Sequence, residues 1–192
     1  MITKVLPDSN VLNSKTVRDW LFLLRDASGG GMFTLHTTED IVSEVTYHLR
    51  RNNRGVDGAV IHRLSQLLRE STDTVIAEYP HLSDFAGADA NDGHIHAAAV
   101  AGEIDLVLTN DSSYLKIEDD RYEISTPDEF FCLVDDSTPR IVQAVALKQF
   151  NYWRAKMNPR SIWHALAQAG CDEFADRVHA HCRALVAPNL ID

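Results

Sequence analysis

Residues 2–12 read ITKVLPDSNVL, and this stretch decides the predicted fold. Its first five residues are mostly apolar or β-branched, which predicts a buried strand. Asp8 follows that strand almost at once, although Val11 and Leu12 soon resume the apolar pattern. An acid at this position is either a turn residue that caps a helix or a metal ligand at the carboxyl end of a central strand. The choice depends on whether other acids are predicted to lie nearby.

Strand and helix patterns alternate along the larger, N-terminal part of the chain. The predicted strands, which are short and rich in apolar or β-branched residues, are 2–6, 32–36, 74–78, 104–109 and 122–126. The predicted helices are 14–27, 37–51, 57–72, 89–101 and a helix that begins at Pro127. Ser14 is placed to cap the first helix, and Thr37 or Thr38 the second. This alternation predicts an α/β fold in which a parallel sheet is flanked by helices.

The C-terminal part of the chain has a different pattern, because residues 138–186 read as helices only. We therefore predict an α/β domain over 1–137 and an all-helical C-terminal extension over 138–192. The charge is also uneven: residues 1–139 hold 11 basic and 24 acidic side chains, whereas 140–192 hold 7 and 4. The net charge of −10 argues against a large electrostatic footprint on nucleic acid.

Other features of the composition predict a cytoplasmic protein. No apolar stretch approaches the roughly 20 residues that are needed to span a bilayer. The N-terminal residues MITKVLPD lack the pattern of a secretory signal peptide. The three cysteines are sparse and odd in number, which fits a reducing compartment better than a disulfide framework.

Four acids are predicted to gather at one edge of the sheet. Asp8 and Asp111 each follow a strand, and ligands of open α/β sheets bind outside the carboxyl ends of the strands. Asp92 lies in the first turn of the alanine-rich helix, and Glu44 borders the apolar stripe of helix 37–51. Taken singly, these acids are explained as cap residues, helix-dipole partners or solvated side chains. Together they form a set of hard oxygen ligands, which suits Mg²⁺ or Mn²⁺.

Four segments of the sequence carry a family resemblance. In chain order they are LPDSNVL, EDIVSEV, DANDGHIHAAAVAGEIDLVLTND and STPDEFF. In this order they resemble the PIN-domain family of metal-dependent ribonucleases, and especially the VapC-type toxins of bacterial toxin–antitoxin pairs. The resemblance spans residues 2–134, and the tail 138–186 resembles the helical C-terminal extension of one subgroup. It implies a PIN-like fold with a nuclease site.

The resemblance also implies the roles of individual residues. The catalytic and metal-binding acids of the family fall on Asp8, Glu44, Asp92 and Asp111. The residues that would support them by holding a water molecule or the carboxylates are Ser9, Asn10 and Thr109. The implied reaction is endonucleolytic hydrolysis of RNA by water activated by Mg²⁺ or Mn²⁺. The implied partners are the RNA substrate, a small antitoxin protein and a second copy of this chain in a homodimer.

Two positions depart from the family pattern, and two other functions stay open. Asn91 and Ser113 stand where many members carry further acids, which argues against a second tightly held metal ion. A phosphatase with an acid nucleophile would need a second aspartate where this chain has Asn10. Outside enzymes, the alternative is a catalytically silent PIN module that binds RNA or a partner protein.

Other patterns have simpler explanations. His94 and His96 are two residues apart and do not share a helix face, so packing or surface roles are favoured over a zinc site. Cys171, His179 and Cys182 lack the second close pair that a zinc site would show. Several dispersed basic residues could follow an RNA backbone, or could equally be ordinary helix-surface charge. They are Arg50, Arg51, Arg54, Lys148, Arg154, Lys156 and Arg160.

Overall fold

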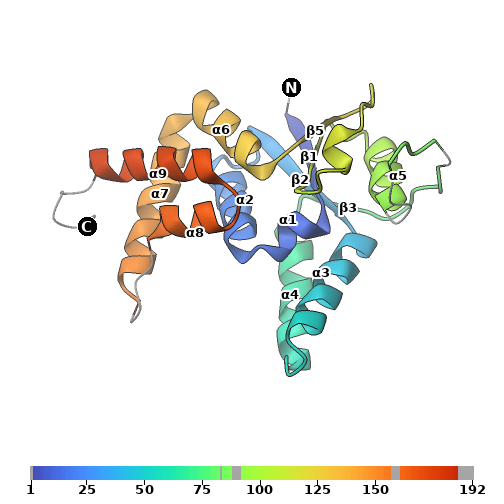
Figure 1. Cartoon of the computed structure of the whole chain (residues 1–192), viewed down its shortest axis with the longest axis horizontal. Coiled ribbons are helices and arrows are strands. Elements are labelled where there is room, and N and C mark those ends of the chain that lie inside the picture. Colours follow the sequence, from blue (N-terminus) through green and yellow to red (C-terminus); the bar gives the residue numbers. More distant parts are fainter. Residues whose placement is uncertain (1, 83, 88–91, 157–160, 186–192) are drawn as a thin grey trace.

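The chain builds a five-stranded parallel sheet with helices on both faces (Figure 1). The computed structural model describes residues 2–82, 84–87, 92–156 and 161–185. The strand order is β3-β2-β1-β4-β5. The strands are β1 (Thr3–Pro7), β2 (Phe33–Thr38), β3 (Thr74–Ile76), β4 (Leu106–Leu108) and β5 (Glu123–Ser125). All five were predicted from sequence to within a few residues, and so was the parallel α/β arrangement.

The first strand is the central one, with a parallel neighbour on each side. Val5 aligns with Leu35 of β2 on one side and with Leu106 of β4 on the other. The outer pairs, β2 with β3 and β4 with β5, are parallel as well. The carboxyl ends of all strands therefore meet at one edge of the sheet, and Asp8 follows the central strand there.

Nine helices lie in the described part of the chain. They are α1 (Ser9–Asn13), α2 (Lys15–Ala27), α3 (Glu39–Asn52), α4 (Gly58–Glu70), α5 (Gly93–Ala101), α6 (Pro127–Ser137), α7 (Pro139–Arg154), α8 (Ile162–Gln168) and α9 (Asp172–Leu185). A 3-10 turn covers Tyr114–Lys116. The single turn α1 was not predicted, because Asp-Ser-Asn resembles an ordinary turn. The residues 89–91 and Arg160, which figured in the sequence predictions, lie outside the described residues.

The helix caps agree with the sequence patterns. The Ser14 hydroxyl accepts a hydrogen bond from the Val17 amide at 3.4 Å, and Thr38 accepts one from the Ile41 amide at 3.1 Å. These side chains satisfy amides that have no partner within the helix. Thr38 thereby fixes the start of α3 directly after β2, at the carboxyl edge of the sheet.

Helices α3 and α4 form a hairpin that projects away from the sheet (Figure 1). Near the sheet, a bidentate ion pair joins the two helices. Arg69 Nε and Nη2 donate to the two Glu39 carboxylate oxygens at 2.8 and 2.7 Å. The far end of the hairpin is the connection between Asn52 and Gly58. This hairpin therefore extends outward from the edge at which the strands end.

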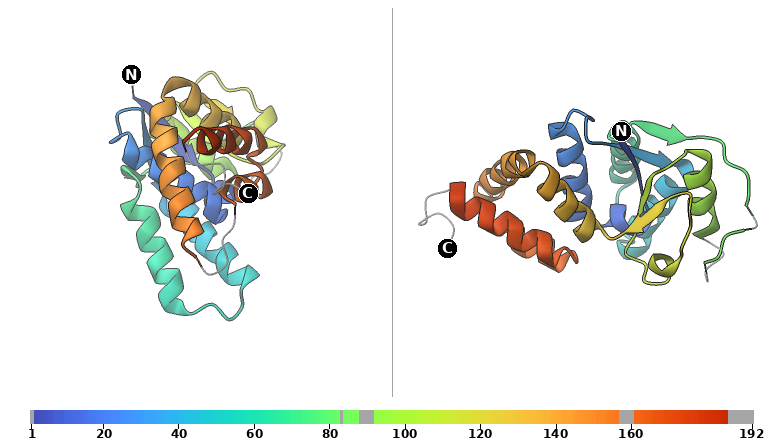
Figure 2. Two further views of the ribbon diagram at one scale, coloured as in Figure 1. Left: turned by 90° about the vertical axis from the view of Figure 1, so that its left-hand side faces the viewer. Right: turned by 90° about the horizontal axis from the view of Figure 1, so that it is seen from above.

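The C-terminal helices share the core of the α/β part rather than standing apart from it. Figure 2 shows α7, α8 and α9 grouped beside α2 and α6. The Phe174 ring of α9 lies 5.1 Å from the Trp20 ring of α2 and 4.9 Å from the Phe131 ring of α6. All three side chains are buried. Among the described residues, no helix combines the length and the apolar character needed to cross a membrane.

Candidate functional site

Asp8 is a buried acid that does not cap the helix it precedes. It occupies the N-cap position of α1, yet its side chain makes no capping hydrogen bond. Only 6% of the residue is exposed, and its backbone amide donates to the Leu108 carbonyl at 2.8 Å. Among the described residues, no ion pair involves Asp8. The explanation of Asp8 as a helix cap is therefore excluded, because its side chain makes no capping hydrogen bond to α1.

Two side chains hold the Asp8 carboxylate at the end of the neighbouring strand. The Thr109 hydroxyl donates to Asp8 Oδ2 at 2.9 Å, and Asn10 Nδ2 donates to the same oxygen. Asn10 also donates to Thr109 Oγ1 at 2.9 Å and accepts from the Asn110 amide at 3.0 Å. These bonds join the ends of β1 and β4, so the carboxylate has a fixed orientation.

Burial raises the pKa of Asp8 above its usual value, since the charged form loses its water. The hydrogen bond from Thr109 opposes this shift of the pKa, and the negative charge of Glu44 adds to it. A buried carboxylate without a basic partner is costly unless it binds a proton or a cation. The environment of Asp8 thus favours binding of a positive group.

Glu44 faces Asp8 from helix α3, which packs against α1. The His94 Nε2 atom of α5 lies 3.0 Å from Glu44 Oε1. Burial acts to raise the pKa of Glu44, but hydrogen bonds from His94 and Ser9 outweigh it and lower the pKa. Burial likewise acts to lower the pKa of His94, but its contact with Glu44 raises it. Glu44 and His94 therefore form a pair in which each favours the charged form of the other, and sequence reasoning missed it.

Asp111 follows β4, as predicted, but its carboxylate turns into its own loop. Asp111 Oδ1 accepts from the amide and the hydroxyl of Ser113, both at 2.6 Å, and from the Tyr114 amide at 3.3 Å. These hydrogen bonds lower the pKa of Asp111. The Ser113 side chain, which stands where many PIN sequences have an acid, thus holds Asp111. The Asp111 amide also donates to Thr109 Oγ1 at 3.1 Å, which ties this loop to Asp8.

Asp92 stands at the N-cap position of α5, without a capping side-chain hydrogen bond. The sequence predicted Asp92 within the first turn of this helix, whereas the residue lies one position before the helix begins at Gly93. Burial and the hydroxyl of Tyr122 raise the pKa of Tyr114, and the charges of Asp8 and Asp92 raise it further. Asp8 and Asp92 therefore both lie close enough to Tyr114 to influence its charge.

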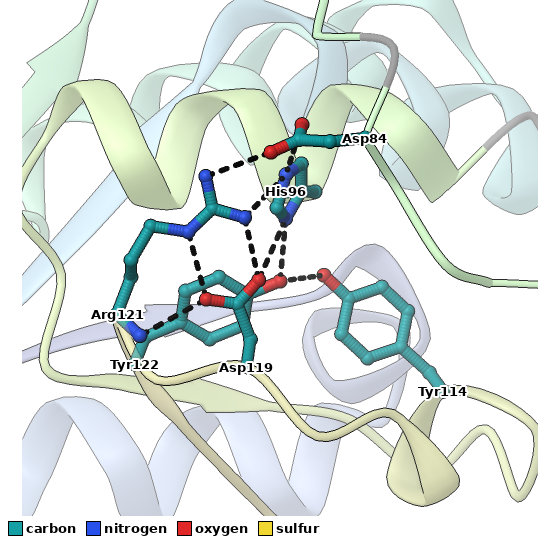
Figure 3. A network of polar contacts seen from close by, with 6 residues as sticks. All are labelled: Asp84, His96, Tyr114, Asp119, Arg121 and Tyr122. Atoms are coloured by element: carbon teal, nitrogen blue, oxygen red, sulfur yellow. Dashed lines mark hydrogen bonds and ion pairs between the residues drawn. The ribbon is translucent and has the colours of Figure 1, made fainter.

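A buried polar network connects helix α5 to the loop that follows Asp111 (Figure 3). His96 is 1% exposed, and its Nδ1 atom lies 2.8 Å from the Tyr122 hydroxyl. The Tyr122 hydroxyl lies 3.3 Å from that of Tyr114. Asp92 and His96 are four residues apart on one helix face, and Tyr114 follows Asp111 by three residues. The network thus fixes the elements that carry Asp92 and Asp111.

Charged residues close the outer side of this network (Figure 3). Arg121 Nη2 donates to Asp119 Oδ2 at 2.7 Å, and Arg121 Nη1 donates to Asp84 Oδ2 at 3.0 Å. The other Asp84 oxygen, Oδ1, lies 3.2 Å from His96 Nε2. His96 is therefore a core histidine with polar partners, as the sequence spacing favoured, and it is not placed as a zinc ligand.

The four predicted acids come from one edge of the sheet, but they do not form a closed set of ligands. Among the residues that the structure describes, no three His, Cys, Asp or Glu side chains are placed to hold a metal ion together. The donor chemistry at Asp8 and Glu44 nevertheless suits a divalent cation, since both offer carboxylate oxygens and Asp8 has no basic partner. Asp111 is engaged by its own loop.

Comparison with known proteins identifies the family of the chain. A family model described as the PIN domain matches residues 4–113, which is more than half of the chain and includes all four acids. No curated protein and no solved structure matches the chain. PIN domains are generally nucleases that use divalent metal ions. The match agrees with the parallel sheet and its flanking helices, and with the segments that resemble this family. The chain therefore belongs to the PIN-domain family.

Proposed function

We propose that the protein is a metal-dependent endoribonuclease that acts as the toxin of a type II toxin–antitoxin pair, of the VapC type. The observation that carries the nuclease proposal is the environment of Asp8. Its buried carboxylate follows the central strand, caps no helix and is oriented by Thr109 and Asn10. The toxin assignment rests on the resemblance of the motifs and of the helical extension.

The proposed ligands of Mg²⁺ or Mn²⁺ are Asp8, Glu44, Asp92 and Asp111. When bound, the ion would lower the pKa of a water molecule and stabilise negative charge on the phosphate that is attacked. Thr109 and Asn10 hold one oxygen of Asp8, so the carboxylate keeps its orientation. His94 and Ser9 hold Glu44 in its ionised form. These supporting residues fix the acids before substrate arrives, which lowers the reorganisation needed for catalysis.

Cleavage of RNA by the purified protein tests the nuclease proposal. We expect cleavage with Mg²⁺ or Mn²⁺, its loss in EDTA, and a loss of at least about a hundredfold in Asp8→Asn. The matched control is Asp176→Asn, because Asp176 is exposed on α9, away from the sheet edge. Equal cleavage by Asp8→Asn, or cleavage that persists in EDTA, would contradict the proposal.

The same test distinguishes the nuclease from the alternative function. A catalytically silent PIN module would bind RNA or a protein without metal-dependent cleavage, and the engagement of Asp111 by its own loop is the observation that favours it. If RNA stays intact with either metal while the protein is folded, the silent module is the correct reading.

Growth on expression tests the toxin role separately. We propose that the partners are a small antitoxin protein and a second copy of this chain, that the protein acts in the cytoplasm, and that residues 1–137 form the nuclease domain. Expression should arrest growth, and co-expression of a small protein encoded beside it should relieve the arrest. Cleavage of RNA in vitro without growth arrest would leave the nuclease proposal intact and refute the toxin role.

A further inference from the structure

An open pocket lies at the edge of the sheet where the strands begin, opposite the edge that carries the candidate site. Its volume is about 520 Å³, and it is lined by the first residues of four strands, which are Thr3, Phe33, Leu106 and Glu123. A strand rises about 3.3 Å per residue, so Asp8 lies about 16 Å along β1 from Thr3. Figure 1 shows α6 beside the upper end of the sheet and α1, which follows Asp8, at the lower end. The pocket is therefore separate from the candidate site.

Apolar side chains form the wall of this pocket. Helix α6 contributes Phe130, Leu133 and Val134, which lie within one helical turn and share a face. The Phe130 ring packs edge-on against the Phe33 ring of β2 at a centroid distance of 5.1 Å, and both residues are buried. The volume and the apolar wall are typical of pockets that bind ligands.

The apolar surface continues beyond the pocket onto its rim. Leu133 is 60% exposed and Ile2 is 48% exposed, and both line the pocket. Large apolar side chains that are exposed beside a pocket are typical of surfaces that bind another protein, where one anchor residue fills the pocket. This width favours a segment of a protein as the occupant over a small molecule.

Acidic side chains border the same surface. Among the described residues that line the pocket are four acids, Asp105, Asp119, Asp120 and Glu123, and one basic residue, Arg121. Arg121 already pairs with Asp119, because its Nη2 atom donates to Asp119 Oδ2 at 2.7 Å. The other three acids form no ion pair within the part of the chain that the structure describes. The pocket is therefore bordered by three acids that have no basic partner there.

Two of these acids lie side by side. The Glu123 amide donates to the Asp105 carbonyl at 2.8 Å, so the two carboxylates belong to the starts of neighbouring strands. Asp105 Oδ2 accepts from the Lys4 amide at 2.7 Å, whereas the Lys4 ammonium lies 3.7 Å from Glu103 Oε2 instead. Like charges on neighbouring strands repel each other. A positive group from outside the chain would relieve this repulsion.

We propose that this surface docks a basic segment of a partner protein. An apolar residue of the segment enters the pocket beside Leu133 and Ile2, and flanking lysine or arginine side chains face Asp105, Asp120 and Glu123. Charge complementarity selects this occupant, because the same acids repel an acidic segment. A second copy of this chain is disfavoured, since a two-fold contact would bring the acids of both copies together. The inference does not depend on the proposed nuclease function, because it concerns the other edge of the sheet.

Binding of designed peptides in EDTA tests the docking surface. The probe is a fluorescein-labelled hexapeptide in which leucine and phenylalanine lie between pairs of lysines, and fluorescence anisotropy measures its affinity. Two matched peptides carry glutamate in place of lysine, or serine in place of leucine and phenylalanine. We expect both to bind at least about tenfold more weakly than the probe. The affinity of the probe should fall as the salt concentration is raised.

Variants of the protein test the residues of the surface. Leu133→Ser should weaken binding of the probe about tenfold, because it removes the apolar rim. Asp120→Asn and Glu123→Gln should each weaken it about threefold and reduce its salt dependence. The matched controls are Leu147→Ser, at a 37% exposed position of α7, and Asp176→Asn on α9, which should bind as wild type does. All these positions are exposed, so unchanged melting temperatures would show that the variants are folded.

The location of the peptide needs a control of its own, because the acids at the carboxyl edge of the sheet also attract a basic peptide. Asp8→Asn should bind the probe with the affinity of wild type. Loss of binding in Asp8→Asn, with wild-type affinity in Leu133→Ser, would place the peptide at the carboxyl edge and overturn the proposal. Equal binding of the glutamate peptide, or no saturable binding of the probe up to about 1 mM, would overturn it as well.

Sedimentation of the protein alone tests a second copy as the occupant. The proposal predicts that wild type and Leu133→Ser have the same oligomeric state, whichever state that is. A dimer of the wild type that Leu133→Ser dissociates would show that the pocket binds another copy of the chain, and it would overturn the proposal of a basic partner.

Discussion

The Thr109 hydroxyl is one of two side-chain groups that donate hydrogen bonds to the Asp8 carboxylate. Thr109 is fully buried, donates to Asp8 Oδ2 at 2.9 Å and accepts from the Asp111 amide at 3.1 Å. A single side chain thus orients one predicted acid and fixes the loop of another. Any change that keeps the shape of Thr109 but removes the hydroxyl leaves a buried carboxylate and a backbone amide without this partner.

Thr109→Val is expected to destabilise the protein by about 1–3 kcal/mol, because it leaves buried polar groups unsatisfied while preserving volume. Thr109→Ser, which keeps the hydroxyl, should retain most of this free energy. Urea unfolding of the three proteins measures the difference. A Thr109→Val protein as stable as wild type would show that the Asp8 carboxylate has other partners that suffice.

A second residue-scale prediction concerns pH. The hydrogen bonds and charge of Arg121 lower the pKa of Asp119 to about 2, whereas burial opposes this shift. A carboxylate whose pKa is lower in the folded state stabilises the fold above its unfolded pKa of about 3.8, and this stabilisation is lost as pH falls toward 2. Arg121 is 40% exposed, so solvent screening limits the contribution to about 1 kcal/mol.

Asp119→Asn should therefore be less stable than wild type at pH 6, and the difference in unfolding free energy should shrink as pH falls below 3.8. Asp120→Asn, at the exposed neighbouring position, serves as the control. Denaturant unfolding at several pH values gives the difference. A constant difference from pH 6 to pH 2.5 would show that Asp119 acts through packing alone.

At the scale of elements, local patterns specified most helices and strands. Caps such as Ser14 and Thr38 are local hydrogen bonds, so their residue types reveal them in the sequence. The turn α1 was missed because a helix of five residues has too little periodicity to show. The Glu44–His94 pair could not be predicted, because it joins two helices that only tertiary packing brings together. In the sequence, the position of His94 two residues after Asp92 was the one indication that His94 has a role at the site.

The cap of α3 gives the prediction at this scale, since this helix carries Glu44, one of the proposed metal ligands. Thr38 is fully buried, and Thr38→Ala removes the acceptor of the Ile41 amide. We expect a loss of about 1 kcal/mol of unfolding free energy. Thr38→Ser should recover most of it. If the serine and alanine variants are equally destabilised, the methyl group of Thr38 rather than its hydroxyl is what matters.

At the scale of the whole molecule, the C-terminal helices belong to the same core as the α/β part. The sequence predicted that they are helical, but it did not reveal which helices of the α/β part they cover. Their aromatic residues meet α2 and α6, through the contacts of Phe174 with Trp20 and Phe131. The average charge was equally uninformative, because a net charge of −10 concealed a local excess of arginine over residues 45–69, which hold five arginines and one aspartate.

Phe174→Ala should reduce the stability of the whole molecule by about 3–5 kcal/mol, because it leaves a cavity in this shared core. Leu133→Ala is the control, since Leu133 is 60% exposed. If the core is continuous, the variant shifts a single unfolding transition. Two separate transitions, with the one from the α/β part unchanged, would show that the helical extension folds independently.

Titration of Mn²⁺ into the purified protein by calorimetry tests the central claim most directly. The claim is that Asp8 is a buried carboxylate that is oriented to bind a divalent ion. The account predicts that wild type and Asp176→Asn bind Mn²⁺ with equal affinity and that Asp8→Asn binds at least about tenfold more weakly. Binding of Mn²⁺ by Asp8→Asn with the affinity of wild type would contradict it.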